Sequence, residues 1–339
     1  MNKSLLALAV LGAFAGTVSA QSSVTIGGTM DLAARHISNQ GRGSVQVLAP
    51  NGLSTSALRF FGTEDMGGGL KAGFWLEAAV NPDTGTAEAA KFWGRRSTVS
   101  LISNFGEVRL GRDYTPTFWN TTVFDPFGTN GVGNSRNVAN FGGVLTNVRA
   151  DNSIGYFLPA MGGIYGQAMA AAGEGDPNGK YIGARLGFAS GPINVAVAVG
   201  RQDMNPTIGR RFNNWNVGAS YDLGMAKLMA FYNHEENKST AVDENRMLLG
   251  VSVPMGQGTI NASYVRSDLK GGTVGANDAT QIALGYQYAL SKRTTIYGTG
   301  SRLDNKGAGR LTIGGGPAGF IPNAGRNSTG IEAGIRHTF

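Results

Sequence analysis

Arginine side chains are the residues of this chain whose type and spacing suggest chemistry. Four arginines lie within or beside segments in which apolar and polar residues alternate, and two aspartates lie in the long stretch at 113–147. These six candidates are Arg59, Arg95, Arg96, Arg149, Asp113 and Asp125. A guanidinium stays protonated in water and offers only hydrogen-bond donors, so it suits the attraction of anions better than proton transfer. We therefore expect a polar site that attracts anions.

Catalytic chemistry finds little support in the sequence. The chain has no cysteine, and its three histidines are His36, His234 and His337. A serine hydrolase would need Ser, His and an orienting group together, and His234 with Glu235 and Ser239 is the only candidate. Neither an HExxH sequence, a nucleotide-binding loop nor a cysteine-based metal motif is present. We therefore expect no enzyme, no cofactor and no metal site.

Hydrophobicity alternates with period two through most of the chain. In 193–200, Ile and Val occupy every second position, and in 281–288, Ile, Leu and Tyr alternate with Gln, Ala and Gly. Seven short, Gly-rich connectors alternate with eight longer polar ones, which makes fifteen connections and sixteen strands. A soluble β-sandwich also alternates, but it rarely reaches this strand number without a cysteine or a linker. The pattern predicts an all-β fold, a 16-stranded antiparallel transmembrane β-barrel.

The stretch at 113–147 is the third of the long connectors and the longest gap between predicted strands. A structureless loop of this length is unusual in an ordinary compact domain. Inside a wide barrel it can fold into the lumen and narrow it. The sequence therefore predicts a barrel whose long third loop forms the constriction of a pore.

The N-terminus has the features of a secretory signal peptide. Lys3 provides the positive charge, Leu5 begins a short apolar run, and the small residues Val18 and Ala20 lie at −3 and −1 of a cleavage site. We expect residues 1–20 to be removed and residues 21–339 to form a single domain in the outer membrane. The net charge is +7, but Lys and Arg are scattered rather than clustered, so nucleic acid is not expected as a partner.

The C-terminal segment alternates as well and ends on an aromatic residue. One face carries Ile331, Ala333, Ile335, His337 and Phe339. The other carries Glu332, Gly334, Arg336 and Thr338. We expect this segment, with Phe339 at its end, to be the terminal strand that closes the barrel.

Several segments together resemble the general porins of Gram-negative bacteria, of the β-proteobacterial type. They are 23–32, 62–72 (GTEDMGGGLKA), 105–116 (FGEVRLGRDYTP), 149–156 and the closing 337–339. The resemblance covers the whole chain. It implies a sixteen-stranded barrel, a homotrimer in the lipid and lipopolysaccharide of the outer membrane, an infolded third loop, and a ladder of arginines facing acidic groups on that loop.

The arginines differ in how clearly their direction can be predicted. Arg59 shares a face with Ala57, where the family usually has the arginine, so one rung of the ladder is displaced by roughly 6–7 Å. Alternation directs Arg149 toward water. Arg95 and Arg96 are neighbours, so a regular strand points only one of them inward; the family favours Arg95, whereas alternation favours Arg96.

Function follows from the charge balance of the predicted constriction. The loop contributes few acids, Asp113 and Asp125, against several arginines, which predicts a channel for small ions and hydrophilic solutes that prefers anions. Two alternatives stay open: a channel selective for small organic anions or phosphate, and an adhesin or structural barrel. Each arginine could equally serve a structural ion pair with an acid of the wall: Glu64, Glu77, Glu107 or Asp151.

Overall fold

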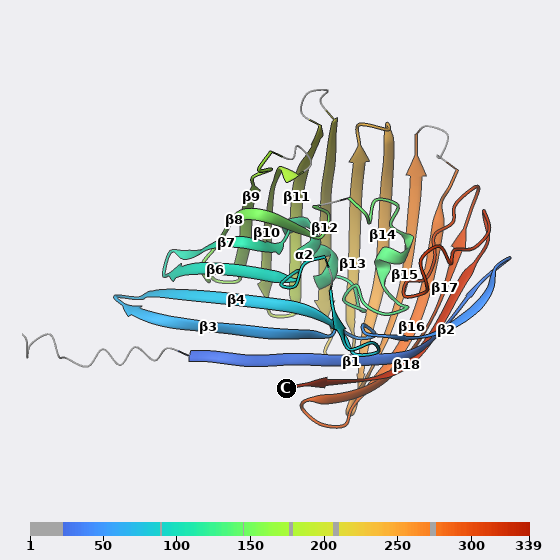
Figure 1. Cartoon of the computed structure of the whole chain (residues 1–339), viewed down its shortest axis with the longest axis horizontal. Coiled ribbons are helices and arrows are strands. Elements are labelled where there is room, and N and C mark those ends of the chain that lie inside the picture. Colours follow the sequence, from blue (N-terminus) through green and yellow to red (C-terminus); the bar gives the residue numbers. More distant parts are fainter. Residues whose placement is uncertain (1–22, 89, 145, 176–178, 206–209, 272–275) are drawn as a thin grey trace, which may run out of the picture.

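The strands of the computed structural model form one continuous antiparallel sheet (Figure 1). The structure describes residues 23–339 except 89, 145, 176–178, 206–209 and 272–275. The predicted signal peptide at 1–20 therefore lies outside the described residues. Sixteen described strands make up the wall: β1 (Ser23–Asn39), β3 (Ala57–Gly67), β4 (Leu70–Asn81), β6 (Arg96–Ser103), β7 (Gly106–Tyr114), β8 (Arg149–Phe157), β9 (Ile164–Ala171), β10 (Tyr181–Ser190), β11 (Ile193–Asn205), β12 (Arg210–Asp222), β13 (Lys227–Asn237), β14 (Val242–Met255), β15 (Gly258–Lys270), β16 (Ala279–Ala289), β17 (Thr294–Asn305) and β18 (Ser328–Thr338). Short strands β2 (Gly43–Ala49) and β5 (Thr86–Ala87) extend two of the connectors.

The sheet closes on itself through β1 and β18. Residues Thr29–Asn39 of β1 pair antiparallel with Ser328–Thr338 of β18. Beyond them the backbones of Gly28 and Phe339 exchange N–H···O bonds of 3.0 and 3.1 Å. Every other wall strand pairs with its sequence neighbours in the wall, so the predicted sixteen-stranded antiparallel barrel is confirmed. Closure gives each of the sixteen described wall strands a partner on both sides. A free strand edge would not be tolerated in a hydrocarbon environment.

The two faces of the wall differ in the way that the alternation predicts. On β16, Ile282 and Leu284 are 63% and 60% exposed on the outside, whereas the alternating residues Gln281 and Ala283 are almost completely buried. Each second side chain points to the same face of a strand. The outer face is therefore an apolar surface suited to lipid, and the inner face is polar.

The short connectors are tight turns that depend on glycine. Gly67, Gly68 and Gly69 between β3 and β4 have φ angles of +81°, +62° and +81°. L-residues with a side chain rarely adopt such angles, whereas glycine does so without steric cost.

The segment between β7 and β8, residues 115–148 without 145, contacts the inner face of the barrel, and we call it the internal segment. It contains the helix α2 (Pro116–Val123) and the 3₁₀ helix η1 (Ser135–Val138). In Figure 1, α2 lies within the outline of the barrel, beside β12 and β13. The Nδ2 atom of Asn120 donates to Oδ1 of Asn216 on β12 at 3.0 Å, and Nε2 of Gln281 donates to the carbonyl of Gly133 at 3.2 Å. Both partners are inward-facing, so the segment crosses the lumen and is bonded to its far wall.

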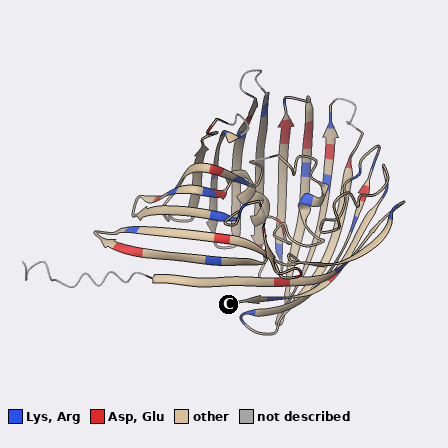
Figure 2. Ribbon diagram, in the orientation of Figure 1, with Lys and Arg blue, Asp and Glu red and all other residues tan. Residues whose placement is uncertain are grey.

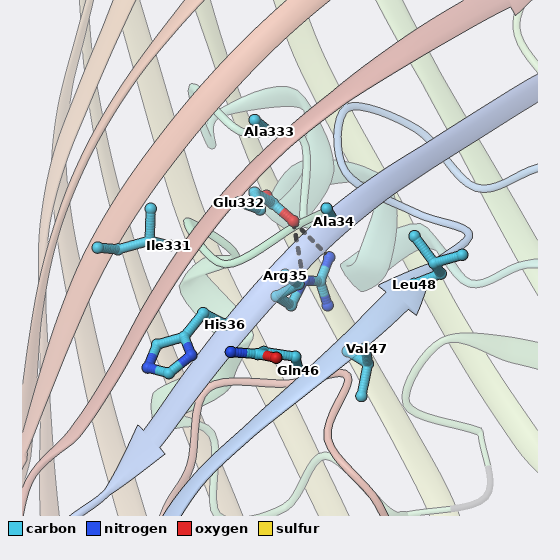
Figure 3. Close-up of a pocket in the computed structure, with 9 residues that line it drawn as sticks. All are labelled: Ala34, Arg35, His36, Gln46, Val47, Leu48, Ile331, Glu332 and Ala333. Atoms are coloured by element: carbon cyan, nitrogen blue, oxygen red, sulfur yellow. Dashed lines mark hydrogen bonds and ion pairs between the residues drawn. The ribbon is translucent and has the colours of Figure 1, made fainter.

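A buried ion pair fixes the closing seam to this segment. Arg35 of β1 and Glu332 of β18 approach to 2.6 Å, and both side chains are at most 1% exposed. Figure 3 shows the pair joined across the two ribbons, beneath a surface groove lined by residues such as His36 and Leu48. The second carboxylate oxygen of Glu332 accepts the backbone N–H of Val132 at 2.9 Å. One carboxylate thus connects both strands of the seam with the internal segment.

Among the residues that the structure describes, none of the helices combines the length and the apolar character needed to cross a bilayer.

We expect Glu332→Gln to lower the free energy of unfolding by about 3–5 kcal/mol, because it leaves the Arg35 guanidinium buried without a counter-charge. Urea unfolding of the barrel refolded in lipid vesicles, followed by tryptophan fluorescence, measures this. Asp304→Asn is the control, because it breaks the solvent-exposed pair with Arg302 and should change stability little. Equal effects of the two substitutions would contradict the role given to the seam.

Candidate functional site

Tyr114, at the end of β7, joins two of the predicted arginines. Its hydroxyl accepts a hydrogen bond from Nη2 of Arg95 at 3.1 Å and from Nη2 of Arg149 at 2.8 Å. The guanidinium of Arg149 also lies 4.3 Å from the centre of the Tyr114 ring, a cation–π distance. Nε of Arg149 donates to the carbonyl of Arg95 at 2.7 Å. The two guanidinium groups are therefore held side by side at the start of the internal segment.

Glu77 of β4 connects Arg95 with Arg59. Its Oε1 accepts Nε of Arg95 at 2.6 Å, and its Oε2 lies 3.4 Å from Nε of Arg59. Arg59 also donates to the hydroxyl of Thr29 at 3.0 Å. Because Arg59 and Glu77 are direct partners in the β3–β4 register, the displaced arginine still faces the interior and contacts the same carboxylate as Arg95.

Arg96 belongs to a second group of charges around Asp113. Its Nε lies 3.8 Å from Oδ2 of Asp113, which also accepts Nη1 of Arg109. Nε of Arg109 pairs with Glu107 at 2.9 Å. The carboxylate of Asp113 is buried, with 2% of the residue exposed, so it acts as a bridge between two arginines.

Arg112 and Lys91 form a third group with Asp151. Nη1 of Arg112 lies 2.6 Å from Oδ1 of Asp151, and Lys91 pairs with the other carboxylate oxygen. Figure 2 shows segments coloured as Lys or Arg close to segments coloured as Asp or Glu on the strands from β3 to β8. One side of the barrel therefore carries a continuous charged wall, made of seven cations and four carboxylates. We call this set the charged wall: Arg59, Lys91, Arg95, Arg96, Arg109, Arg112, Arg149, Glu77, Glu107, Asp113 and Asp151.

Asp125 lies within the internal segment, apart from the charged wall. Its carboxylate accepts the backbone N–H groups of Phe127 at 2.9 Å, Thr129 at 3.2 Å and Ser135 at 3.1 Å, and the residue is 4% exposed. Burial raises the pKa of this carboxyl, while hydrogen bonds from Ser135 and Phe127 oppose the rise. Asp125 thus organises the turn after α2, and its contacts are with the internal segment rather than with the charged wall.

On the opposite wall, two buried glutamates bind the internal segment. Glu244 of β14 accepts the backbone N–H of Asn140 at 3.1 Å, and Glu235 of β13 accepts Nδ2 of Asn147 at 3.0 Å. Arg246 lies 3.6 Å from Glu235 and 3.5 Å from Glu244. These carboxylates are fully buried, so they fix the segment and are shielded from the open lumen.

The structure brings Arg59, Arg95, Arg96, Arg149 and Asp113 onto one wall. Arg95 and Arg96 need not point to opposite faces, because β6 begins at Arg96. Arg95 precedes the strand, so the alternation of side chains along a strand does not apply to it. Both side chains reach the charged wall. Phe339 lies at the seam, where its backbone pairs with Gly28.

The ion-pair alternative also holds in part for these arginines. Glu77, Glu107 and Asp151 each pair with arginines of the wall. Glu64 has no ion pair among the described residues. Carboxylates therefore orient the arginines of the charged wall except Arg149, and the seven cations outnumber the four carboxylates.

Sequence reasoning missed Tyr114 as the shared acceptor of Arg95 and Arg149. It also missed Arg136 in η1 and Arg185 on β10, which donates to Asn120 of α2. The Thr115–Pro116 pair was an available signal for α2, because proline favours the first turn of a helix, and Pro116 lies there. The helix orients Phe118 and Trp119 against Tyr114 at ring distances of 4.8 and 5.3 Å. Within the described residues, no group of three or more His, Asp or Glu could hold a metal ion.

Comparison with known proteins agrees with this architecture. A family model described as Gram-negative porin matches residues 7–308. The outer membrane porin protein 32 of Delftia acidovorans is 40% identical, with the full length of both chains covered. The solved structure of an anion-selective porin from Comamonas acidovorans matches 94% of this chain and 100% of its own, with 37% identity and a TM-score of 0.83. OmpT of Vibrio cholerae, at 17% identity, a TM-score of 0.70 and coverage of 95% and 99%, shares the fold.

We expect Asp125→Ala to destabilise the barrel by about 2–4 kcal/mol, because three backbone N–H groups lose a charged acceptor. Asp125→Asn keeps an acceptor of the same shape and resembles the protonated acid, so it should cost clearly less. Unfolding in urea and limited proteolysis of the internal segment measure both effects. If both substitutions left the urea midpoint and the cleavage pattern unchanged, Asp125 would not organise the segment.

Proposed function

Because the chain belongs to the Gram-negative porin family, we propose that it forms a water-filled channel in the outer membrane whose constriction prefers anions. The family and the closed barrel make it an outer membrane porin. The preference for anions, the residues of the constriction and the assembly of the channel are the parts that we propose.

The charged wall carries the proposal. It contains seven cationic side chains and four carboxylates, an excess of three positive charges. In a narrow pore, fixed charge of one sign raises the local concentration of the opposite ion. Small anions would therefore be enriched beside Arg59, Arg95, Arg96 and Arg149, and cations would be depleted. The anion-selective porin of Comamonas acidovorans, similar along nearly the whole chain, supports this choice of sign.

The internal segment supplies the narrowing. It leaves the wall at Tyr114, crosses to β12 through Asn120, and returns to β8 at Arg149. Its anchoring on opposite sides of the barrel would confine solutes to the space beside the charged wall. Asp113 would contribute to this constriction by orienting Arg96 and Arg109, whereas Asp125 would contribute by shaping the segment.

We propose that the mature protein is a homotrimer embedded in lipid and lipopolysaccharide. The apolar outer face described above fits a lipid environment. The trimer follows from the family resemblance rather than from a contact in the monomer. Chemical cross-linking in outer membrane vesicles, followed by electrophoresis at low temperature, would distinguish a trimer from a monomer.

In a planar bilayer under a potassium chloride gradient, we expect a zero-current potential of the sign for chloride permeation. Arg149→Gln should lower the chloride-to-potassium permeability ratio about twofold to threefold, because one positive charge near the path is lost in a water-like dielectric. Glu77→Gln should raise the ratio for the opposite reason. Arg266→Gln, on the exposed outer face, is the matched control and should leave the ratio unchanged.

A wild-type channel that prefers potassium would contradict the proposed anion selectivity. The assignment of the chain to the porin family would not be affected. Saturation of flux by one organic anion or phosphate would favour a substrate-selective channel. A refolded barrel without conductance would favour an adhesin or structural role.

Intact-mass analysis of protein purified from outer membranes tests the predicted signal peptide. We expect a mature chain that begins at Gln21, because Val18 and Ala20 fit the cleavage rule. Substitution of Ala20 by a bulky charged residue should leave unprocessed precursor in the inner membrane. A mature chain that still contains Lys3 would show this prediction to be wrong.

A further inference from the structure

Three of the arginines inside the barrel, Arg149, Arg185 and Arg136, donate hydrogen bonds only to neutral oxygens, as Arg336 of β18 also does. Arg149 donates to a backbone carbonyl and to the Tyr114 hydroxyl. Arg185 of β10 donates to the side-chain oxygens of Asn120 and Tyr165. Arg136 of η1 donates to the carbonyl of Gly142 at 3.3 Å. Within the described part of the chain, no carboxylate lies within ion-pair distance of any of the three.

Arg136 differs from the other two because the internal segment carries it rather than the wall. The residue lies within η1, which is capped by the Asn134 side chain through the Arg136 backbone N–H at 2.8 Å. Its guanidinium lies 5.3 Å from the centre of the Phe118 ring on α2. Its hydrogen bond to Gly142 is exposed to solvent. The residue itself is partly buried, so the guanidinium has one side against an aromatic ring and only its Gly142 side within reach of solvent.

Two aromatic rings connect Arg136 with Arg149. The Arg149 guanidinium lies 4.3 Å from the Tyr114 ring centre, and the Tyr114 and Phe118 rings are 4.8 Å apart. Arg136 contacts the second of these rings. Ring faces attract guanidinium groups without neutralising their charge. Two charged groups, one on the wall and one on the segment, thus flank the same aromatic pair.

Buried acids near Arg136 offer a different explanation, which is structural. The charges of Glu235 and Glu244 act on Arg136 from the opposite wall. Both acids already contact Arg246, and asparagines of the internal segment hydrogen-bond to them. Neither forms an ion pair with Arg136. The two acids therefore have partners other than Arg136, and charge balance alone does not explain why its hydrogen bond to Gly142 lies within reach of solvent.

We propose that Arg136 is a specificity-determining residue, a positive charge on the internal segment that attracts anions opposite the charged wall. The inference rests on the proposed anion channel and adds to it a second, loop-borne side of the constriction. An anion passing Arg149 would then be attracted from both sides. We expect the ligands to be small anions in general. The guanidinium of Arg136 contacts a ring and a carbonyl, so its charge is not paired with a carboxylate.

Arg136 is well placed to keep its charge and its position. Burial, together with the nearby positive charge of Arg246, lowers its pKa to about 10, so the guanidinium remains protonated at neutral pH. The segment around it is held independently by Asp125 and Glu244, which bind its backbone N–H groups at Ser135 and Asn140. Substitution of the Arg136 side chain therefore leaves the main anchors intact.

Zero-current potentials of Arg136→Gln, Arg136→Lys and Arg266→Gln channels in a potassium chloride gradient test this inference. We expect Arg136→Gln to lower the chloride-to-potassium permeability ratio about twofold to threefold. Arg136→Lys keeps the charge and loses the planar stacking group, so it should keep most of the ratio. Arg266→Gln removes the same charge from the outer face and should change nothing. Unitary conductance and urea midpoints of all three variants show whether the segment stays in place.

The outcomes separate this inference from the proposed function. An anion-preferring wild type with an unchanged ratio in Arg136→Gln would overturn the inference and leave the proposed function standing. Equal changes in ratio and conductance for the Gln and Lys variants would assign Arg136 a structural role and also overturn it. A wild type that prefers cations or does not conduct would overturn the proposed function itself. A lower ratio in Arg136→Gln alone, at unchanged conductance, would support the inference.

Discussion

The requirement that every backbone N–H and C=O be paired where no water is available determines this structure. In a bilayer, a sheet meets it only by closing into a barrel. Closure here depends on the pairing of β1 with β18, which joins the two ends of the chain. The seam also contains the Arg35–Glu332 ion pair. The first and last strands of the chain are therefore joined by an ion pair as well as by backbone hydrogen bonds.

Closure has a consequence for the interior. Since every second residue of the wall points inward, the lumen is lined by side chains such as Gln281, Asn216 and Glu244 that need partners. A chain segment inside the lumen can provide them with its own backbone groups. The acids of β13, β14 and β18 are used in this way, as acceptors for groups of the internal segment. Acids that hold the segment are buried and contribute little to the charge that a passing solute meets.

The strand arrangement could be predicted from the sequence because it depends on local rules. Alternation marks the strands, and turn composition marks their connections. The direction of the Arg95 side chain could not be predicted, because alternation applies only within a strand and β6 begins at Arg96. α2 was missed even though Thr115–Pro116 signals a helix start, because the length of the connector favoured a loop. Tyr114 as the common acceptor for Arg95 and Arg149 depends on the registers of β6, β7 and β8 together, which no local pattern contains.

The same reasoning explains why the charged residues divide into two groups. Most arginines of the charged wall are held by carboxylates, and the strand register fixes the spacing of pairs such as Arg59 and Glu77. Arg136 on the internal segment has no carboxylate partner among the described residues and, like Arg149 on the wall, is held by a ring and a carbonyl instead. An arginine on a ring keeps its full charge because the ring contributes a quadrupole and no counter-ion. The geometry of the wall therefore fixes where charge is placed, and the aromatic residues around α2 determine how much of it remains uncompensated.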